Sequence, residues 1–100
     1  MVQIIWEYSV HPSRIADFVS IYNNTGDWAR FFQRSPHFHG TTLLRHTDHS
    51  NRFLTIDLWD DHSTFTAFKH QNESEYNSLD LRCEELSDEE ECIGTFESVK

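Results

Sequence analysis

Histidine is the residue type with the most evident chemical capacity in this sequence. The 100 residues include seven histidines: His11, His37, His39, His46, His49, His62 and His70. An unperturbed imidazole has a pKa of about 6.5, which suits a general base, and His39 and His70 are the candidates for that role. His37 and His39 flank Phe38, so an extended segment would present both imidazoles on one side, as at the start of a metal site. No third ligand follows at a diagnostic spacing, and we expect no metal ion and no other cofactor.

The segment "RFLTIDLWDD", residues 52–61, alternates in a way that bears on where a site could lie. Its even positions predict the core face of a strand: Leu54, Ile56 and Leu58. Its odd positions alternate large aromatic and polar residues: Phe53, Thr55, Asp57 and Trp59. A strand that turned this second face to water would have no need of Phe or Trp there. We therefore expect another chain or a ligand to cover it.

The flanking patterns predict the elements that position these residues. Residues 2–10 alternate as a strand whose core face carries Val2, Ile4, Trp6, Tyr8 and Val10. Apolar residues at helical spacing predict a helix over 12–23, and Asp27 begins a second helical piece. Strands are expected over 40–47 and 52–59, joined by a hairpin loop. A second main helix is expected after Asp60 or Asp61, and it restarts at Ser74. A capping-box turn is then expected over 87–90, followed by a last strand over 91–99.

This order, β-α-β-β-α-β, predicts an α+β fold of the ferredoxin-like kind, as one domain over residues 1–100. Right-handed crossovers place both helices on one face of a four-stranded antiparallel sheet. The other face must then meet water or a partner. Since the strands carry apolar residues in both phases, we expect a homodimer formed through the open sheet faces. Glu7 would lie on that face and pair with Arg45 or Arg52.

The charge of the chain excludes several classes of partner. Its net charge is −9, from 17 acidic and 8 basic residues, which argues against binding to nucleic acid or to an anionic membrane. No apolar run approaches the length of a membrane span, and the first ten residues lack the features of a signal peptide. Cys83 and Cys92 form no CxxC motif and fit free thiols better than a disulfide. We expect a cytoplasmic protein.

Three segments together resemble the antibiotic biosynthesis monooxygenase family, most closely its small stand-alone members. They read "YSVHPSRIADFVSIYNNTGDWARFFQRSPHFHGTTLLRHT", "RFLTIDLWDDHSTFTAF" and "EYNSLDLRCEELSDEEECIGTFE". The most specific parts are Gly26-Asp27-Trp28, Gly40-Thr41, Leu43-Leu44, and Thr55-Ile56-Asp57 with Trp59. The resemblance implies a dimeric α/β barrel with a pocket between helices and sheet in each protomer. It also implies oxidation of polyketide-type aromatic molecules by dioxygen without metal or flavin.

The resemblance also bears on single residues. Trp59 matches a Trp of the quinone-forming oxygenases, but Thr55 and Phe65 stand where those enzymes carry an amide and a Tyr. The haem-degrading members carry Asn, Trp and His at three positions where this chain has Glu7, Phe68 and Ser78. Haem degradation by that route is therefore not expected.

Two functions remain open at this point. The first is a cofactor-independent monooxygenase acting on a hydrophobic aromatic or polyketide-like small molecule, with Trp59 and His70 as catalytic candidates. Its substrate-binding candidates are Trp28, Thr55, Phe65, Phe68 and Tyr76. The second is a non-catalytic, small-molecule-binding or stress-related protein with the same barrel. Trp59 and Trp28 would serve equally well as packed core residues beneath the helices.

Overall fold

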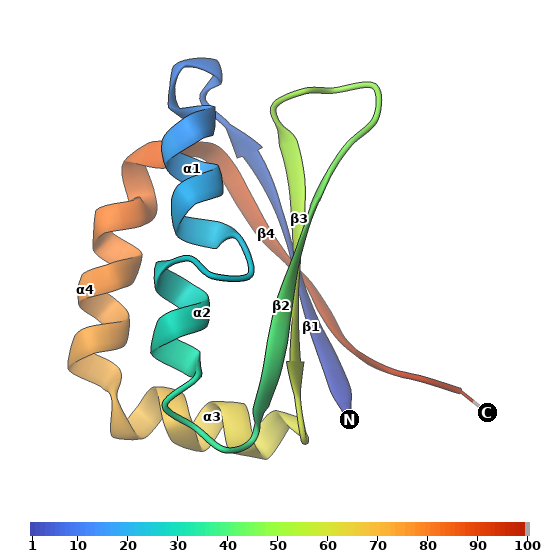
Figure 1. Cartoon of the computed structure of the whole chain (residues 1–100), viewed down its shortest axis with the longest axis vertical. Coiled ribbons are helices and arrows are strands. Elements are labelled where there is room, and N and C mark those ends of the chain that lie inside the picture. Colours follow the sequence, from blue (N-terminus) through green and yellow to red (C-terminus); the bar gives the residue numbers. More distant parts are fainter. Residues whose placement is uncertain (100) are drawn as a thin grey trace.

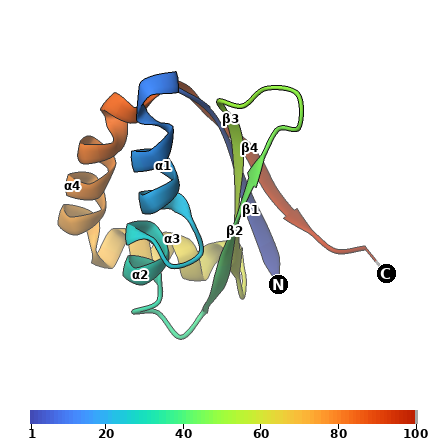
Figure 2. The ribbon, with the colours of Figure 1, turned by 45° about the horizontal axis from the view of Figure 1, so that its top comes forward.

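The four strands form one antiparallel sheet in the order β2-β3-β1-β4. They are β1 (Val2–Val10), β2 (Phe38–Arg45), β3 (Arg52–Trp59) and β4 (Ser87–Glu97). The computed structural model in Figure 1 describes residues 1–99. The helices lie together on one face of the sheet, and its other face is open (Figure 2). The predicted α+β, ferredoxin-like arrangement is confirmed.

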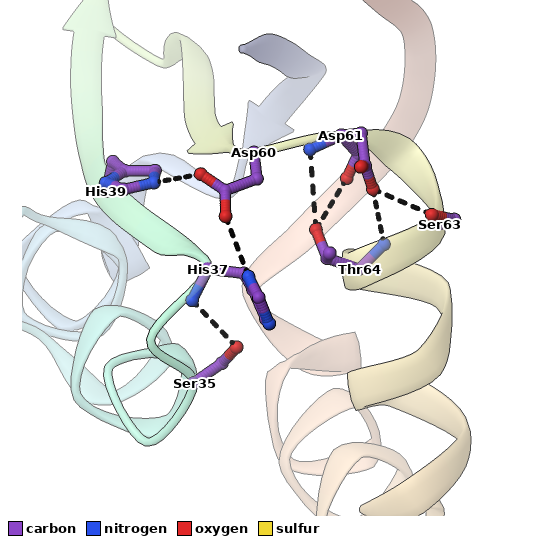
Figure 3. Close-up of polar contacts among 7 residues, drawn as sticks. All are labelled: Ser35, His37, His39, Asp60, Asp61, Ser63 and Thr64. Atoms are coloured by element: carbon purple, nitrogen blue, oxygen red, sulfur yellow. Dashed lines mark hydrogen bonds and ion pairs between the residues drawn. The ribbon is translucent and has the colours of Figure 1, made fainter.

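Four α-helices cover the inner face of the sheet. They are α1 (Ile15–Tyr22), α2 (Asp27–Phe32), α3 (His62–Gln71) and α4 (Glu73–Cys83), with 3-10 turns at Pro12–Arg14 and Glu84–Leu86. Asp61 caps α3, as expected: its carboxylate accepts a hydrogen bond from the Thr64 N–H at 2.8 Å (Figure 3). Gly26 allows the sharp connection from α1 to α2, because a Cβ there would collide with the carbonyl oxygen of Ile21.

The helix-facing side of β3 carries the odd positions, which overturns the predicted core phase of this strand. Three of the odd positions are buried: Phe53, Thr55 and Trp59. The even positions are only half-buried: Leu54, Ile56 and Leu58. The pairing with β1 explains this result, since buried Tyr8 lies opposite Phe53 and paired residues point to the same face. Helices of the same chain therefore cover the aromatic phase, and the predicted core phase of β1 is correct.

The last strand begins earlier than predicted. Ser87 to Glu90 belong to β4, where Ser87 pairs with Val10 and Glu90 with Tyr8, so the expected capping-box turn is wrong. Pairing with a central strand overrides the weak strand preference of this acidic stretch. Strand β2 likewise begins at Phe38 rather than at Gly40, and Gly40 has a φ of +129° at a register shift against β3.

The open face of the sheet carries apolar residues from all four strands. Leu44 and Phe96 are 45% and 41% exposed, and Ile56 of β3 pairs with Ile5 of β1. Glu7 and Arg52 form an ion pair, with 2.6 Å between Oε1 and Nη2, as the sequence predicted. Both cysteines are free thiols. Within residues 1–99, no helix is long and apolar enough to cross a membrane.

Candidate functional site

A pocket lies between the inner face of the sheet and the helices, with a cavity volume of about 50 Å³. Side chains from all four strands and all four helices line it. They are Ile4, Trp6, Tyr8, Tyr22, Trp28, Phe32, Thr41, Thr55, Asp57, Phe65, Tyr76, Asp80 and Glu90. This is the position between helices and sheet that the sequence resemblance implied.

Aromatic rings form the helix side of the pocket. Trp28 of α2 packs edge-on against Tyr76 of α4, with ring centroids 5.1 Å apart. Phe32 of α2 packs in the same manner against Phe65 of α3, at 6.0 Å. Such edge-to-face contacts hold the rings in fixed positions, and the resulting wall suits a flat aromatic ligand.

The sheet side of the pocket is polar, and Asp57 is its central group. Asp57 lies on the inner face of β3, where the Thr41 hydroxyl of β2 donates a hydrogen bond of 2.6 Å to Oδ1. Burial raises the pKa of the Asp57 carboxyl to about 6, against the opposing effect of the Thr41 hydrogen bond. Both protonation states are therefore accessible near neutral pH, which is what a proton acceptor requires.

Three tyrosine side chains, Tyr8, Tyr22 and Tyr76, line the same pocket. Burial raises the pKa of Tyr8 and of Tyr22 well above the usual value. Burial, with the nearby carboxylates of Asp80 and Asp57, raises the pKa of Tyr76 to about 12. All three hydroxyls stay protonated at physiological pH, so they are available to donate hydrogen bonds to a bound oxyanion.

Two exposed carboxylates mark the side on which the pocket opens, and we call Asp80 and Glu90 its mouth. Asp80 lies on α4 and Glu90 on β4, and both side chains are exposed while most of the other lining residues are buried. Burial, followed by the charges of Asp80 and Glu84, raises the pKa of Glu90. The residues that line the pocket include no Lys or Arg, so the mouth is acidic.

The structure brings together four of the seven predicted site residues. Trp28, Thr55, Phe65 and Tyr76 line the pocket. Phe68 does not line it, because its ring packs in the core beneath α3, 5.7 Å from the ring of Trp59. His70 is exposed and lies outside the pocket, which corrects its predicted role as the base. The reason is helical geometry: two residues beyond inward-facing Phe68, a side chain points away from the sheet.

Trp59 is fully buried and stands one layer behind the pocket wall. Its ring centroid lies 5.5 Å from those of Phe32 and Phe65, both of which line the pocket. The Trp59 indole N–H has no hydrogen-bond partner within residues 1–99. In this arrangement Trp59 supports two wall residues and does not itself reach the cavity.

His37 and His39 share one carboxylate outside the pocket. Asp60, at the end of β3, contacts His37 Nδ1 at 2.7 Å and His39 Nε2 at 2.5 Å (Figure 3). These hydrogen bonds, with the His37 contact first, lower the pKa of Asp60. Among residues 1–99, no group of three or more His, Cys, Asp or Glu side chains is arranged to hold a metal ion.

The sequence prediction missed the polar residues of the pocket, above all Asp57, Thr41 and Tyr8. A usable signal was present for Asp57, since it shares a strand phase with Phe53 and Trp59. Had that phase been taken as the inner one, the sequence would have predicted a carboxyl that faces the helices.

Comparison with known proteins places the chain in a family. No protein-family model matches the sequence. A variant of SnoaB, a cofactor-independent oxygenase from Streptomyces nogalater, is 31% identical, with a TM-score of 0.72 over 99% of this chain and 93% of that one. The chain is 38% identical to deoxynogalonate monooxygenase of the same organism over 64% of its own length, and this match spans 51% of that curated relative.

A more distant structure agrees in fold. A candidate antibiotic biosynthesis monooxygenase from Deinococcus radiodurans is 12% identical, with a TM-score of 0.77 over 100% of this chain and 94% of that one. The likeness at that identity concerns the fold, whereas the SnoaB match extends to sequence along nearly the whole of both chains. The chain belongs to the antibiotic biosynthesis monooxygenase family.

Proposed function

We propose that this protein is a cofactor-independent monooxygenase that oxidises a hydrophobic aromatic or polyketide-like small molecule in the pocket described above. The observation that carries the proposal is the composition of that pocket. Aromatic rings of the helices face a polar sheet surface that holds the titrating carboxyl of Asp57, and protonated tyrosines from β1, α1 and α4 line the same pocket. Such a pocket can bind a flat phenol or enol and stabilise its anion, which is the form that reacts with dioxygen.

The chemistry needs only the substrate and dioxygen. Loss of a proton converts the substrate to an anion, which passes one electron to dioxygen, and the resulting carbon radical and superoxide combine to form a C–O bond. Protonation of that peroxide and loss of water leave a carbonyl group. A CH₂ group and O₂ thus become C=O and H₂O, so that one oxygen atom enters the product and no added reductant is consumed.

In this proposal the lining residues have different roles. Trp28, Phe65 and Tyr76 contact the faces and edges of the substrate rings, and Thr55 lies on the sheet side below them. The hydroxyls of Tyr8 and Tyr22 donate hydrogen bonds to the substrate oxyanion as charge develops on it. Exclusion of water by the aromatic wall strengthens these contacts.

The pocket must widen to admit such a molecule. Its cavity volume is about 50 Å³, whereas sites for small ligands typically measure roughly 300–1,000 Å³. Trp6 and Tyr76 are half-buried lining residues. We propose that their rings rotate outward when the ligand enters and close over it afterwards.

We further propose a homodimer formed through the open sheet faces. Leu44 and Phe96 leave large apolar side chains exposed there. The paired residues Ile5 and Ile56 add apolar surface at the centre of the same face. Covering this surface with a second copy would remove it from water, which stabilises the dimer by about 25 cal/mol for each Å² of apolar area buried.

A non-catalytic binding role is the alternative, and one observation favours it. Trp59, the residue shared with the quinone-forming oxygenases, lies behind the pocket wall and not in it. A protein that binds an aromatic molecule without oxidising it would keep the rings of the pocket and need no group that ionises the ligand.

Oxygen consumption distinguishes the two functions. The purified, metal-free protein is tested with anthrone- and naphthol-type phenols and with deoxynogalonate, the substrate in the name of its curated relative. Uptake of dioxygen without added metal or flavin supports the monooxygenase. Saturable quenching of tryptophan fluorescence by the same compounds, with no uptake, supports the binding protein.

A further inference from the structure

The position of the charged groups in the pocket constrains the charge of a ligand. The mouth residues Asp80 and Glu90 are both exposed carboxylates, and the net charge of the chain is −9. A molecule that arrives as an anion meets like charge at the mouth and again at Asp57 inside. A neutral molecule meets no such barrier. The substrate should therefore enter neutral and ionise inside the pocket.

We propose that the pocket takes up a neutral phenol or enol without a carboxylate group, and that Asp57 removes its proton. This inference rests on the proposed oxygenase function and adds to it the substrate class and the base. In the step, the substrate O–H bond breaks, its proton binds a carboxylate oxygen of Asp57, and the electron pair stays on the substrate as an enolate or phenolate. Dioxygen is the oxidant that consumes this anion.

Within residues 1–99, the side-chain hydrogen bond of Asp57 engages Oδ1, so that Oδ2 is left for a ligand. Thr41 donates to Oδ1 at 2.6 Å, which fixes the carboxyl plane on the inner face of β3. Oδ2 is then the atom that can accept a hydrogen bond from a substrate hydroxyl in the pocket. A phenol resembles the Tyr side chain, which has a pKa of about 10. Proton transfer from a phenol to a carboxylate with a pKa of about 6 therefore has an equilibrium constant of roughly 10⁻⁴. The tyrosine donors reduce that factor, because they stabilise the anion that forms.

Other titratable side chains line the same pocket, and an experiment must distinguish their titration from that of Asp57. Strand β1 contributes Tyr8, helix α1 contributes Tyr22, helix α4 contributes Tyr76 and Asp80, and strand β4 contributes Glu90. The tyrosines have raised pKa values and do not titrate near neutral pH. The lining residues of β2, α2 and α3 carry no ionisable group. Glu90, whose pKa is also raised, is the group that an experiment must distinguish from Asp57.

Ligand binding under anaerobic conditions tests the inference without requiring turnover. The probes are 2-naphthol, its methyl ether and a naphthol carboxylic acid, and the readout is quenching of tryptophan fluorescence between pH 5 and pH 8. The proteins are the wild type, Asp57→Asn and Glu90→Gln. Asp48→Asn serves as a matched control, because Asp48 is an exposed residue of the β2–β3 loop.

The expected pattern is specific to a hydroxyl that donates to the Asp57 carboxylate. The affinity of the wild type for 2-naphthol should rise roughly tenfold as Asp57 ionises through pH 6, because a charge-assisted hydrogen bond replaces a neutral one. Glu90→Gln and Asp48→Asn should keep that rise, and Asp57→Asn should lose it. The methyl ether should bind with no pH dependence. The carboxylic acid should bind at least about tenfold more weakly at pH 7 than 2-naphthol does.

Contrary results are equally distinct. A rise that persists in Asp57→Asn, or that disappears in Glu90→Gln, would overturn the role of Asp57. Equal affinity for the carboxylic acid, or no binding of 2-naphthol by the wild type, would overturn the substrate class. Oxygen uptake with a carboxylate-bearing substrate alone would support the oxygenase and contradict this inference. The expected binding pattern without oxygen uptake for any ligand would support Asp57 as the acceptor and contradict the oxygenase.

Discussion

Thr41 and Asp57 lie directly opposite each other on β2 and β3, and the Thr41 hydroxyl donates a hydrogen bond of 2.6 Å to the Asp57 carboxyl. This pair places a titrating group on the inner face of the sheet, among lining residues that are apolar or hydroxylic apart from the mouth residues Asp80 and Glu90. Burial raises the pKa of Asp57, and the hydrogen bond from Thr41 limits that rise because it favours the ionised form.

Replacement of Thr41 by Val should raise the pKa of Asp57 further. The change keeps the shape of the side chain and removes the hydroxyl that stabilises the carboxylate. Loss of one such hydrogen bond corresponds to about 1 kcal/mol, or nearly one pKa unit. The midpoint of the pH dependence of 2-naphthol binding should move upward by that amount. An unchanged midpoint would show that Thr41 does not set the acidity of Asp57.

Asp57 should also reduce stability at neutral pH. Its folded pKa, about 6, exceeds the usual aspartate value of 3.8, so the folded protein binds more protons than the unfolded chain between pH 4 and pH 6. Stability therefore falls as pH rises through that window, by at most about 3 kcal/mol. Asp57→Asn, which still accepts from Thr41, should be more stable than wild type at pH 7 by about 1–3 kcal/mol.

Thermal unfolding at two pH values checks this prediction. The gain in melting temperature for Asp57→Asn should be present at pH 7 and absent at pH 4, where the folded carboxyl is already protonated. Asp48→Asn, which removes an exposed carboxylate, should show no such difference. A loss of stability at pH 7 in Asp57→Asn would mean that the carboxylate is held by contacts stronger than the Thr41 hydrogen bond.

Trp59→Phe should affect stability more than ligand binding. The smaller ring leaves a void among Phe32, Phe65 and Phe68, but the change also removes a buried N–H without a partner within residues 1–99. These two effects oppose each other and should leave a net loss of about 1–2 kcal/mol. Chemical denaturation gives the stability, and fluorescence quenching by 2-naphthol gives the affinity. A large loss of affinity with unchanged stability would instead place Trp59 in contact with the ligand.

A charge on the open sheet face should dissociate the proposed dimer. Ile56 lies at the centre of that face, paired with Ile5, so Ile56→Glu would bury an unpaired carboxylate between two copies. Sedimentation velocity should show a dimer for the wild type and a monomer for this variant. Ala67→Glu adds the same charge at an exposed site on α3 and should stay dimeric. A monomeric wild type would contradict assembly through this face.

Local patterns were sufficient to predict the fold but not the interior of the pocket. The alternation in β1 lies within one segment, and so does the helical spacing of Ile15, Phe18 and Tyr22. Each pattern can be interpreted without knowledge of neighbouring elements, and the structure agrees with both predictions. Strand β3 was harder, because both of its phases contain large apolar residues. Its inner phase depends on the pairing with β1, which is a relation between distant segments.

The same limitation explains the residues that were missed. Tyr8, Thr41 and Asp57 come from three separate strands and meet only in the folded chain. His37 and His39 were considered for metal or base chemistry, whereas the structure pairs both with Asp60, more than twenty residues away in sequence. Side-chain type and spacing identified candidates, but only the packing of helices on the sheet determined which of them line the pocket.

Oxygen uptake by the metal-free protein, compared between wild type and Asp57→Asn with a neutral anthrone-type substrate, tests the central claim most directly. The account predicts uptake by the wild type that rises with pH through about 6. It predicts that the rate of uptake falls roughly 10²–10⁴-fold in Asp57→Asn, and that this fall is smaller for substrates whose hydroxyl is more acidic. Undiminished uptake by Asp57→Asn, or no uptake by the wild type with any neutral phenol or enol, would contradict it.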